Sequence, residues 1–181
     1  MIRCYITDRR ALGGRALGGI DALLENARRV AGAVDWIQLR EKDLPSDELL
    51  AIARELVKLP PKLIVNSNVD VARACGAAGA HLPSGVPFPS DIPANFLLGV
   101  SCHSVAEVVR AQKAGYVFLS PIFPSPSKPG YGPALGLAQL AEAARRVSIP
   151  VLALGGVNES NAPACVAAGA AGYASISAWQ L

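Results

Sequence analysis

Gln38, Arg40 and Lys42 stand at alternate positions at the end of a short apolar run, and their types suit phosphate chemistry. In an extended backbone, alternate side chains point to the same side, so one amide and two cations would face the same cavity. Such groups donate hydrogen bonds to phosphate or pyrophosphate oxygens. The alternative is a solvated strand end, with Glu41 and Asp43 among its surface charges.

A second candidate phosphate site lies toward the end of the sequence. Gly155 and Gly156 follow one apolar run, and Ser175, Ile176 and Ser177 end the next. Glycine lets backbone N–H groups approach an oxyanion closely, and barrels often bind phosphate after their seventh and eighth strands. A glycine pair is also common in ordinary turns, but its position before a serine-rich strand end favours phosphate binding.

The segment SPIFPSPSKPGYG, residues 120–132, is rich in Pro, Ser and Gly. Its side chains Ser125, Ser127 and Lys128 could contact anionic oxygen, so we predict an active-site loop. A plain proline-stiffened connection is the alternative.

Asn66, His81, Ser101 and His103 end further apolar runs. Histidine titrates near neutral pH and transfers protons, so His103 is a candidate acid or base, with Cys102 beside it as a weaker one. A histidine at such a position is as often a packed structural residue as a catalytic one. The position that both histidines share, at strand ends, favours a functional role.

Eight short apolar runs are typical of strands covered on both faces. They begin at Arg3, Val34, Lys62, Gly79, Leu98, Tyr116, Ile149 and Gly172. Amphipathic or alanine-rich helix patterns lie between them, over residues 21–33, 46–59, 68–80, 104–115, 136–148 and 158–170. Several of these patterns begin at Ser, Asp or Asn and end on Gly, as helices do.

This order of elements predicts one domain over residues 1–181, an α/β protein with a TIM (β/α)8 barrel. Trp179, Gln180 and Leu181 leave no room for an eighth helix, so we expect a truncated or disordered flank there. An open flavodoxin-like sheet is the second choice. It is disfavoured because the strands are too many and no glycine-rich nucleotide motif follows the first one.

The composition indicates a globular protein with a large core, 51% apolar and 17% charged. A formal net charge of +3 is too small and dispersed for a nucleic-acid surface. The four cysteines form no CxxC pair, so we expect reduced thiols in a cytoplasmic protein. No apolar run approaches the roughly 20 residues of a membrane span.

Eight short motifs follow one another over almost the whole chain: YITD, QLREKD, VNSNVDVA, GAHLPSG, GVSCHS, SPIFPSPSKPG, LALGGV and ASISA. In this order and spacing they resemble the family of thiamine phosphate synthase and its relative, the thiazole tautomerase. The resemblance implies a part in thiamine biosynthesis.

The synthase of this family joins a pyrimidine pyrophosphate to a thiazole phosphate in a Mg²⁺-assisted transfer. The resemblance implies a role for each matching position. These are Gln38 and His81 on the pyrimidine side; Arg40, Lys42, Asn66, Ser101 and Lys128 around pyrophosphate; Ser125 and Ser127 near the thiazole; and Gly156, Ile176 and Ser177 around the product phosphate.

The sequence departs from the synthase pattern where carboxylates would hold magnesium. Asn66-Ser67 stands at the third strand end, and Ser84-Gly85 after the fourth. Because Mg²⁺ is normally held through carboxylates, we predict no metal site. Asp70 falls on the following helix, where we expect a structural or capping role.

The run HLPSG resembles the tautomerase branch more closely, which shifts a double bond in a thiazole carboxylate phosphate. That branch has a histidine at the position of Pro121, so His103 is the nearest acid or base left. We therefore expect a tautomerase-like protein that binds a thiazole phosphate or thiamine phosphate, with His103, Lys128 and Arg40 as catalytic residues.

Two alternatives stay open. One is an active synthase, with Mg²⁺ held by substrate phosphates, and the other is a non-catalytic regulatory protein that binds a phosphate ligand. Apart from that Mg²⁺, no cofactor is expected. The expected partner is a phosphorylated thiazole or pyrimidine, with no nucleic acid or membrane, and the chain could form a homodimer.

Overall fold

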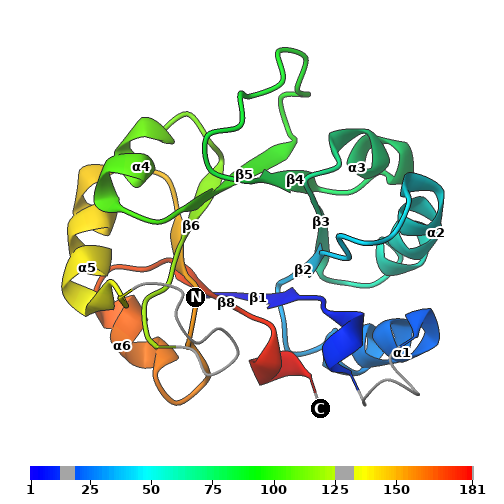
Figure 1. The fold of residues 1–181 in the computed structure, drawn as a ribbon, viewed down its shortest axis with the longest axis horizontal. Coiled ribbons are helices and arrows are strands. Elements are labelled where there is room, and N and C mark those ends of the chain that lie inside the picture. Colours follow the sequence, from blue (N-terminus) through cyan, green and yellow to red (C-terminus); the bar gives the residue numbers. More distant parts are fainter. Residues whose placement is uncertain (13–18, 125–132, 181) are drawn as a thin grey trace.

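Eight parallel strands close into a barrel in the computed structural model, which describes residues 1–12, 19–124 and 133–180. The strands are paired in chain order, and β1 also pairs with β8, which closes the barrel (Figure 1). Their bounds are β1 Ile2–Ile6, β2 Trp36–Leu39, β3 Lys62–Asn66, β4 Gly79–Leu82, β5 Leu97–Cys102, β6 Tyr116–Leu119, β7 Val151–Ala153 and β8 Gly172–Ser175. The predicted TIM barrel is confirmed, and the open sheet is excluded by the β1–β8 pairing.

The helices form a ring outside the barrel (Figure 1). They are α1 Ile20–Val30, α2 Ser46–Leu56, α3 Val69–Cys75, α4 Val105–Arg110, α5 Gly136–Arg146 and α6 Ala162–Ala167, with short 3₁₀ helices η1 Arg9–Ala11 and η2 Ser177–Trp179. Each α-helix lies within or overlaps a range predicted from the sequence. Hydrophobic residues at helical spacing bury one face of each helix against the strands.

Alternation along the strands separates two apolar clusters, because successive side chains of a strand point to opposite faces. Residues facing the helices form the larger cluster. The barrel interior is filled by Cys4, Ile6, Trp36, Ile64, Tyr116, Phe118, Leu152 and Ala174. This packed interior leaves chemistry to the barrel ends, and the carboxyl ends of parallel strands all meet at one of them.

The connection between β4 and β5, residues 83–96, contains no helix and extends outward from the barrel (Figure 1). Two hydrogen bonds fix it to α3, from Arg73 Nη1 to an Asp91 carboxylate oxygen at 3.0 Å and from Arg73 Nη2 to the Asp91 carbonyl at 2.7 Å. Val86 and Phe88 are its exposed apolar side chains.

The segment after β8 covers the flank that we expected to be exposed. Trp179 of η2 is 4% exposed and stacks on Tyr173 with ring centroids 6.0 Å apart. Asn26 of α1 donates to the Trp179 carbonyl at 2.9 Å, and the Gln180 amide donates to the Asp8 carbonyl at 2.8 Å. A single 3₁₀ turn therefore joins the end of the described chain to α1 and to the loop after β1.

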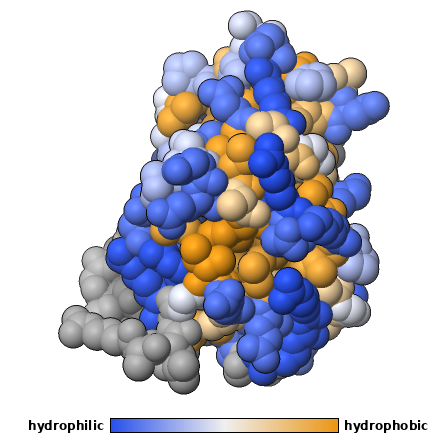
Figure 2. Space-filling view, turned by 90° about the vertical axis from the view of Figure 1, so that its right-hand side faces the viewer, coloured by the Kyte–Doolittle hydropathy of each residue, from blue (hydrophilic) through white to orange (hydrophobic). Residues whose placement is uncertain are grey.

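On the side of the molecule shown in Figure 2, hydrophobic residues emerge between hydrophilic ones. No helix among the described residues is long and apolar enough to cross a membrane.

Candidate functional site

Polar side chains of neighbouring strands meet in register at the carboxyl end of the barrel. Asn66 of β3 is paired with His81 of β4, and His81 with Gly99 of β5, two residues before Ser101. Gln38 of β2 lies on the same inward-facing row, two residues after Trp36. The structure thus brings these predicted residues together around one mouth.

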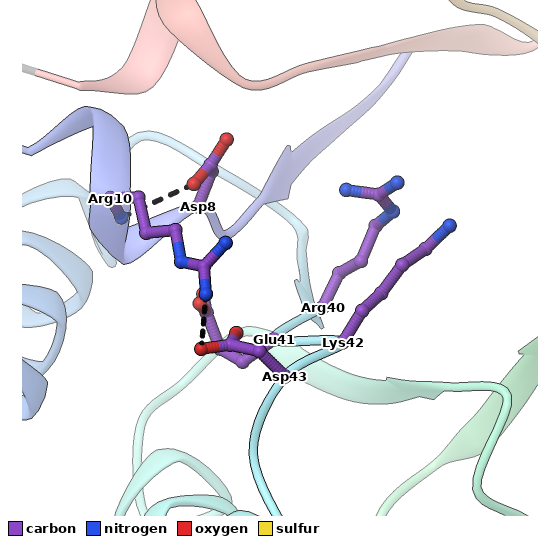
Figure 3. A pocket seen from close by; sticks show the side chains of 6 residues that line it. All are labelled: Asp8, Arg10, Arg40, Glu41, Lys42 and Asp43. Carbon is purple, nitrogen blue, oxygen red and sulfur yellow. Dashed lines mark hydrogen bonds and ion pairs between the residues drawn. The ribbon is translucent and has the colours of Figure 1, made fainter.

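A hollow of about 260 Å³ opens beside β2, lined by Asp8, Arg10, Arg40, Glu41, Lys42 and Asp43. Arg40 and Lys42 extend from the strand end in the same direction, as their alternate spacing predicted (Figure 3). Gln38 is 1% exposed, and among the described residues its amide nitrogen has no hydrogen-bond partner. The hollow is therefore lined by the two cations, while the Gln38 amide is buried two residues before Arg40.

Glu41 is not a solvated surface charge, the alternative that the sequence left open, whereas Asp43 is exposed; both form ion pairs that support the rim of this hollow. The Glu41 carboxylate is 6% exposed and accepts from the Thr7 hydroxyl at 2.7 Å and from Arg9 Nη1 at 3.0 Å. Asp43 pairs with both Arg9 and Arg10. Hydrogen bonding to Arg9 holds the pKa of Asp43 well below its usual range, although partial burial opposes this.

The end of β3 makes a tight turn with a left-handed residue. Ser67 has φ = 61°, a conformation that Asn and Gly adopt more readily than Ser. The next residue, Asn68, caps α3 by accepting from the Val71 N–H at 2.9 Å and donates to the Ser46 hydroxyl at 3.1 Å. The capping role suggested for Asp70 therefore belongs to Asn68, while Asp70 lies in the first turn of the helix.

His81 is a buried, fully hydrogen-bonded side chain. It is 1% exposed, with Nδ1 3.0 Å from the Tyr116 hydroxyl and Nε2 2.9 Å from the Ser101 hydroxyl. Burial, and then the charge of Arg40, lower the pKa of His81 to about 3. Its ring is therefore neutral at physiological pH.

His103 lies at the rim, against the residue that precedes Pro121. Its Nδ1 is 3.0 Å from the Ser120 carbonyl oxygen, which can only accept a hydrogen bond. The neutral ring therefore carries its proton on Nδ1, and Nε2 is the basic nitrogen. This hydrogen bond holds the ring in one orientation.

Glu107 of α4 fixes the loop that carries His103. Its carboxylate accepts from the His103 N–H at 3.0 Å and from the Ser84 hydroxyl at 2.7 Å. Burial raises the pKa of Glu107, but the hydrogen bonds from Ser84 and His103 outweigh that effect and lower it overall. Glu107 therefore joins the loops after β4 and β5 as a carboxylate.

The glycine pair after β7 lies directly under the chain that follows β6. Gly155 and Gly156 have φ of 89° and 64°. A Cβ on Gly156 would lie 2.6 Å from the Pro124 carbonyl oxygen, and one on Gly155 2.8 Å from Pro121 Cα. Both the backbone conformation and the close approach require glycine here.

The three predicted phosphate ligands after β8 have different surroundings. The Ser175 hydroxyl accepts from the Ala178 N–H at 3.3 Å and so supports η2. Ile176 packs against the interior cluster, and Ser177 is exposed at the start of η2. Ser125, Ser127 and Lys128 lie outside the described residues.

Sequence reasoning missed Tyr116 and Glu107, which contact the two histidines, and it included Ser120 only as the start of the predicted active-site loop. Alternation from Trp36 and Phe118 could have placed Tyr116 inside the barrel. Ser120 contacts His103 from another strand end, which no local pattern reveals. Glu107 lies only four residues after His103, but its contact with Ser84 joins separate loops.

Fold and site together define a (β/α)8 barrel with polar and charged residues, Arg40 and Lys42 among them, at the carboxyl ends of its strands. A family model described as "Thiamine monophosphate synthase" matches residues 4–179. The chain therefore belongs to the thiamine-phosphate synthase family. The enzyme that gives this family its name is a transferase.

Individual relatives agree with this assignment. A thiamine-phosphate synthase of Roseiflexus sp. (strain RS-1) is 43% identical over 188 residues, covering 96% of this chain and 75% of the relative. One of Methanocella arvoryzae is 46% identical over 165 residues, covering 85% and 78%. Among solved structures, thiamine phosphate pyrophosphorylase from Pyrococcus furiosus is 31% identical with a TM-score of 0.77, covering 97% of this chain and 85% of that one.

Proposed function

We propose that this chain binds a phosphorylated thiazole compound in the barrel mouth and isomerises it by proton transfer, as the thiazole tautomerase branch does. The observation that carries the proposal is the position of His103. Its ring lies at the Ser120 carbonyl, next to Pro121, the position of the histidine in that branch. An imidazole thus reaches the same region from β5 instead of β6.

The proton transfer requires one basic nitrogen near the substrate carbon. His103 Nε2 would remove a proton from one carbon of the ring system and return it to another, so that the double bond moves and no atom is gained or lost. The hydrogen bond from Nδ1 to the Ser120 carbonyl would stabilise the imidazolium formed in between.

The rest of the mouth suits a phosphate group. Arg40 and Lys42 can donate to its oxygens. The backbone N–H groups after β7 are a further proposed contact, and Gly156 is required there because the chain after β6 fills the place of a side chain. Lys128, Ser125 and Ser127 remain proposed contacts from the loop after β6.

The residues present do not fit a resident magnesium ion. At the ends of β3 and β4, the oxygen donors are the Asn66 amide and the hydroxyls of Ser67 and Ser84, and Ser84 is engaged by Glu107. Mg²⁺ in proteins is usually held by one or two carboxylates. Among the described residues, no group of three or more His, Cys, Asp or Glu side chains could hold a metal.

An active synthase is the second candidate, favoured by the pair Arg40 and Lys42. Two cations side by side suit a pyrophosphate leaving group, whose developing charge they would stabilise. The names of the relatives agree with this candidate. Any Mg²⁺ would then have to arrive with the substrate phosphates.

One experiment separates the candidates. Purified protein is incubated with thiazole carboxylate phosphate alone, and separately with pyrimidine pyrophosphate, thiazole phosphate and Mg²⁺. We expect isomerisation in the first mixture, reduced about 10²-fold or more in His103→Ala. Gln112→Ala, an exposed change two residues beyond the end of α4, serves as the matched control.

Coupled product in the second mixture would overturn the tautomerase assignment in favour of the synthase. Thiamine phosphate binding without turnover in either mixture would instead support a non-catalytic regulatory protein. Isomerisation that persists in His103→Ala would refute the role of His103 but not the tautomerase assignment.

A further inference from the structure

Three polar side chains form a continuous hydrogen-bonded line from the barrel interior to its mouth. The Tyr116 hydroxyl is 3.0 Å from His81 Nδ1, and His81 Nε2 is 2.9 Å from the Ser101 hydroxyl. Tyr116 is fully buried and His81 nearly so, whereas Ser101 is partly exposed at the mouth. We call Tyr116, His81 and Ser101 the interior relay.

The barrel is built around the inner end of this relay. A Cβ on Gly99 would lie 2.1 Å from the Tyr116 ring, so only glycine leaves room for the tyrosine. Trp36 contacts the same ring edge-on, with 4.8 Å between the ring centroids. The centroid of the Phe118 ring lies 4.3 Å from that of the His81 ring. The Tyr116 hydroxyl therefore lies among apolar groups, where an unmade hydrogen bond is costly.

This burial decides the direction of each hydrogen bond. Within residues 1–12, 19–124 and 133–180, the acceptor available to the Tyr116 hydroxyl is His81 Nδ1. If Nδ1 carried the proton instead, the Tyr116 O–H would be a buried donor without a partner, at a cost of about 1–3 kcal/mol. Tyr116 therefore donates to Nδ1.

The remaining directions follow from the chemistry of a neutral imidazole, which has one N–H and one bare nitrogen. With Nδ1 bare, Nε2 carries the proton and donates to the Ser101 oxygen. The lowered pKa of His81, about 3, excludes a ring with both nitrogens protonated at neutral pH. The Ser101 proton is then left to point away from His81.

We propose that Tyr116 and His81 are positioning residues that turn the Ser101 hydroxyl into a fixed donor toward an anionic phosphate or pyrophosphate oxygen in the mouth. The inference deepens the proposed function, on which its ligand side rests. A serine in water donates and accepts equally well. Here its acceptor side is occupied by the Nε2–H, so the mouth would select an acceptor and disfavour a donor at this point.

The direction of the relay is measurable without any ligand. The ¹⁵N chemical shifts of His81 in labelled protein at pH 7 distinguish a protonated ring nitrogen from a bare one. We expect Nε2 protonated and Nδ1 bare in the wild type, and a mixture of tautomers in Tyr116→Phe. Tyr173→Phe, which removes a hydroxyl from the outer face of β8, should leave the His81 signals unchanged.

The donor role is tested by a double-mutant cycle with inorganic pyrophosphate as the probe. We expect Ser101→Ala to weaken pyrophosphate binding about tenfold or more, and Tyr116→Phe about three- to tenfold. Tyr116→Phe should have no further effect in the Ser101→Ala background, because it acts through that hydroxyl.

Each result has one meaning. A His81 ring protonated on Nδ1 in the wild type would overturn the relay, whatever the protein binds. Equal effects of Tyr116→Phe in both backgrounds would show a merely structural role. Correct tautomers without pyrophosphate binding in the wild type would refute the donor role and the proposed phosphate site, while loss of isomerisation alone would leave the relay standing.

Discussion

The Thr7 hydroxyl donates to the Glu41 carboxylate at 2.7 Å and accepts from the Arg40 N–H at 2.9 Å. One threonine thus joins the ends of β1 and β2 directly beneath the cationic rim. Glu41 adds contacts to the Arg9 backbone N–H and guanidinium. The position of Arg40 therefore depends on its neighbour Glu41, whose side chain points in the opposite direction.

Replacement of Glu41 by alanine should destabilise the fold and displace Arg40. Because the carboxylate is buried and hydrogen-bonded to charged and polar partners, we expect a loss of about 2–4 kcal/mol in the free energy of unfolding. Urea denaturation measures it, with Glu48→Ala on the exposed face of α2 as the control, within about 0.5 kcal/mol of wild type. A Glu41→Ala protein as stable as that control would contradict this role.

Replacement of Gly156 by alanine should cost both stability and phosphate affinity. The new Cβ would meet the Pro124 carbonyl at 2.6 Å in a backbone with φ = 64°. We expect about 1–3 kcal/mol of destabilisation, and at least about tenfold weaker binding of inorganic phosphate by calorimetry. Gly32→Ala is the matched control, since its Cβ meets nothing within 4 Å. Unchanged phosphate affinity in a folded Gly156→Ala protein would remove the glycine pair from the binding site.

The barrel could be predicted from the sequence because its signals are local. Apolar runs such as KLIVN and capped helix patterns such as that beginning at Ser104 need only neighbouring residues to form. The inward direction of Gln38 and Arg40 followed from the same alternation. Alternation also sends the side chains of Ser175 and Ile176 to opposite faces, although both were predicted as phosphate ligands.

Contacts between distant segments could not be predicted. Glu41 was treated as a possible surface charge because its partners Thr7 and Arg9 lie more than 30 residues away. The left-handed turn at Ser67 is also set by tertiary contacts, since Ser67 N–H donates to the His81 carbonyl at 2.8 Å. Such turns usually carry Asn, Asp or Gly, so the residue type gave no signal.

His81 should make the protein sensitive to mild acid. Its pKa is about 3 in the fold and 6.5 without it, so between these values the unfolded chain binds the extra proton. Stability therefore rises with pH across this window and falls on acidification, by about 1–2 kcal/mol between pH 7 and pH 5.

The measurement is urea denaturation at pH 7, 6 and 5. His81→Gln should lose most of this pH dependence, whatever its stability at pH 7. Val108→Ala, a buried change without a titrating group, should be destabilised but keep the wild-type slope. An identical slope in His81→Gln and wild type would show that His81 is not the buried neutral group described above.

Trp179 should contribute to stability as a core residue although it follows the last strand. It is 4% exposed, stacks on Tyr173 and accepts a hydrogen bond from Asn26 through its carbonyl. We expect Trp179→Ala to lower the free energy of unfolding by about 3–5 kcal/mol, the usual cost of emptying a large buried site. Circular dichroism in urea measures this without depending on the tryptophan signal. Phe88→Ala, an exposed aromatic change in the β4–β5 connection, should cost far less. Equal midpoints for the two variants would mean that η2 does not cover the flank between β8 and α1 in solution.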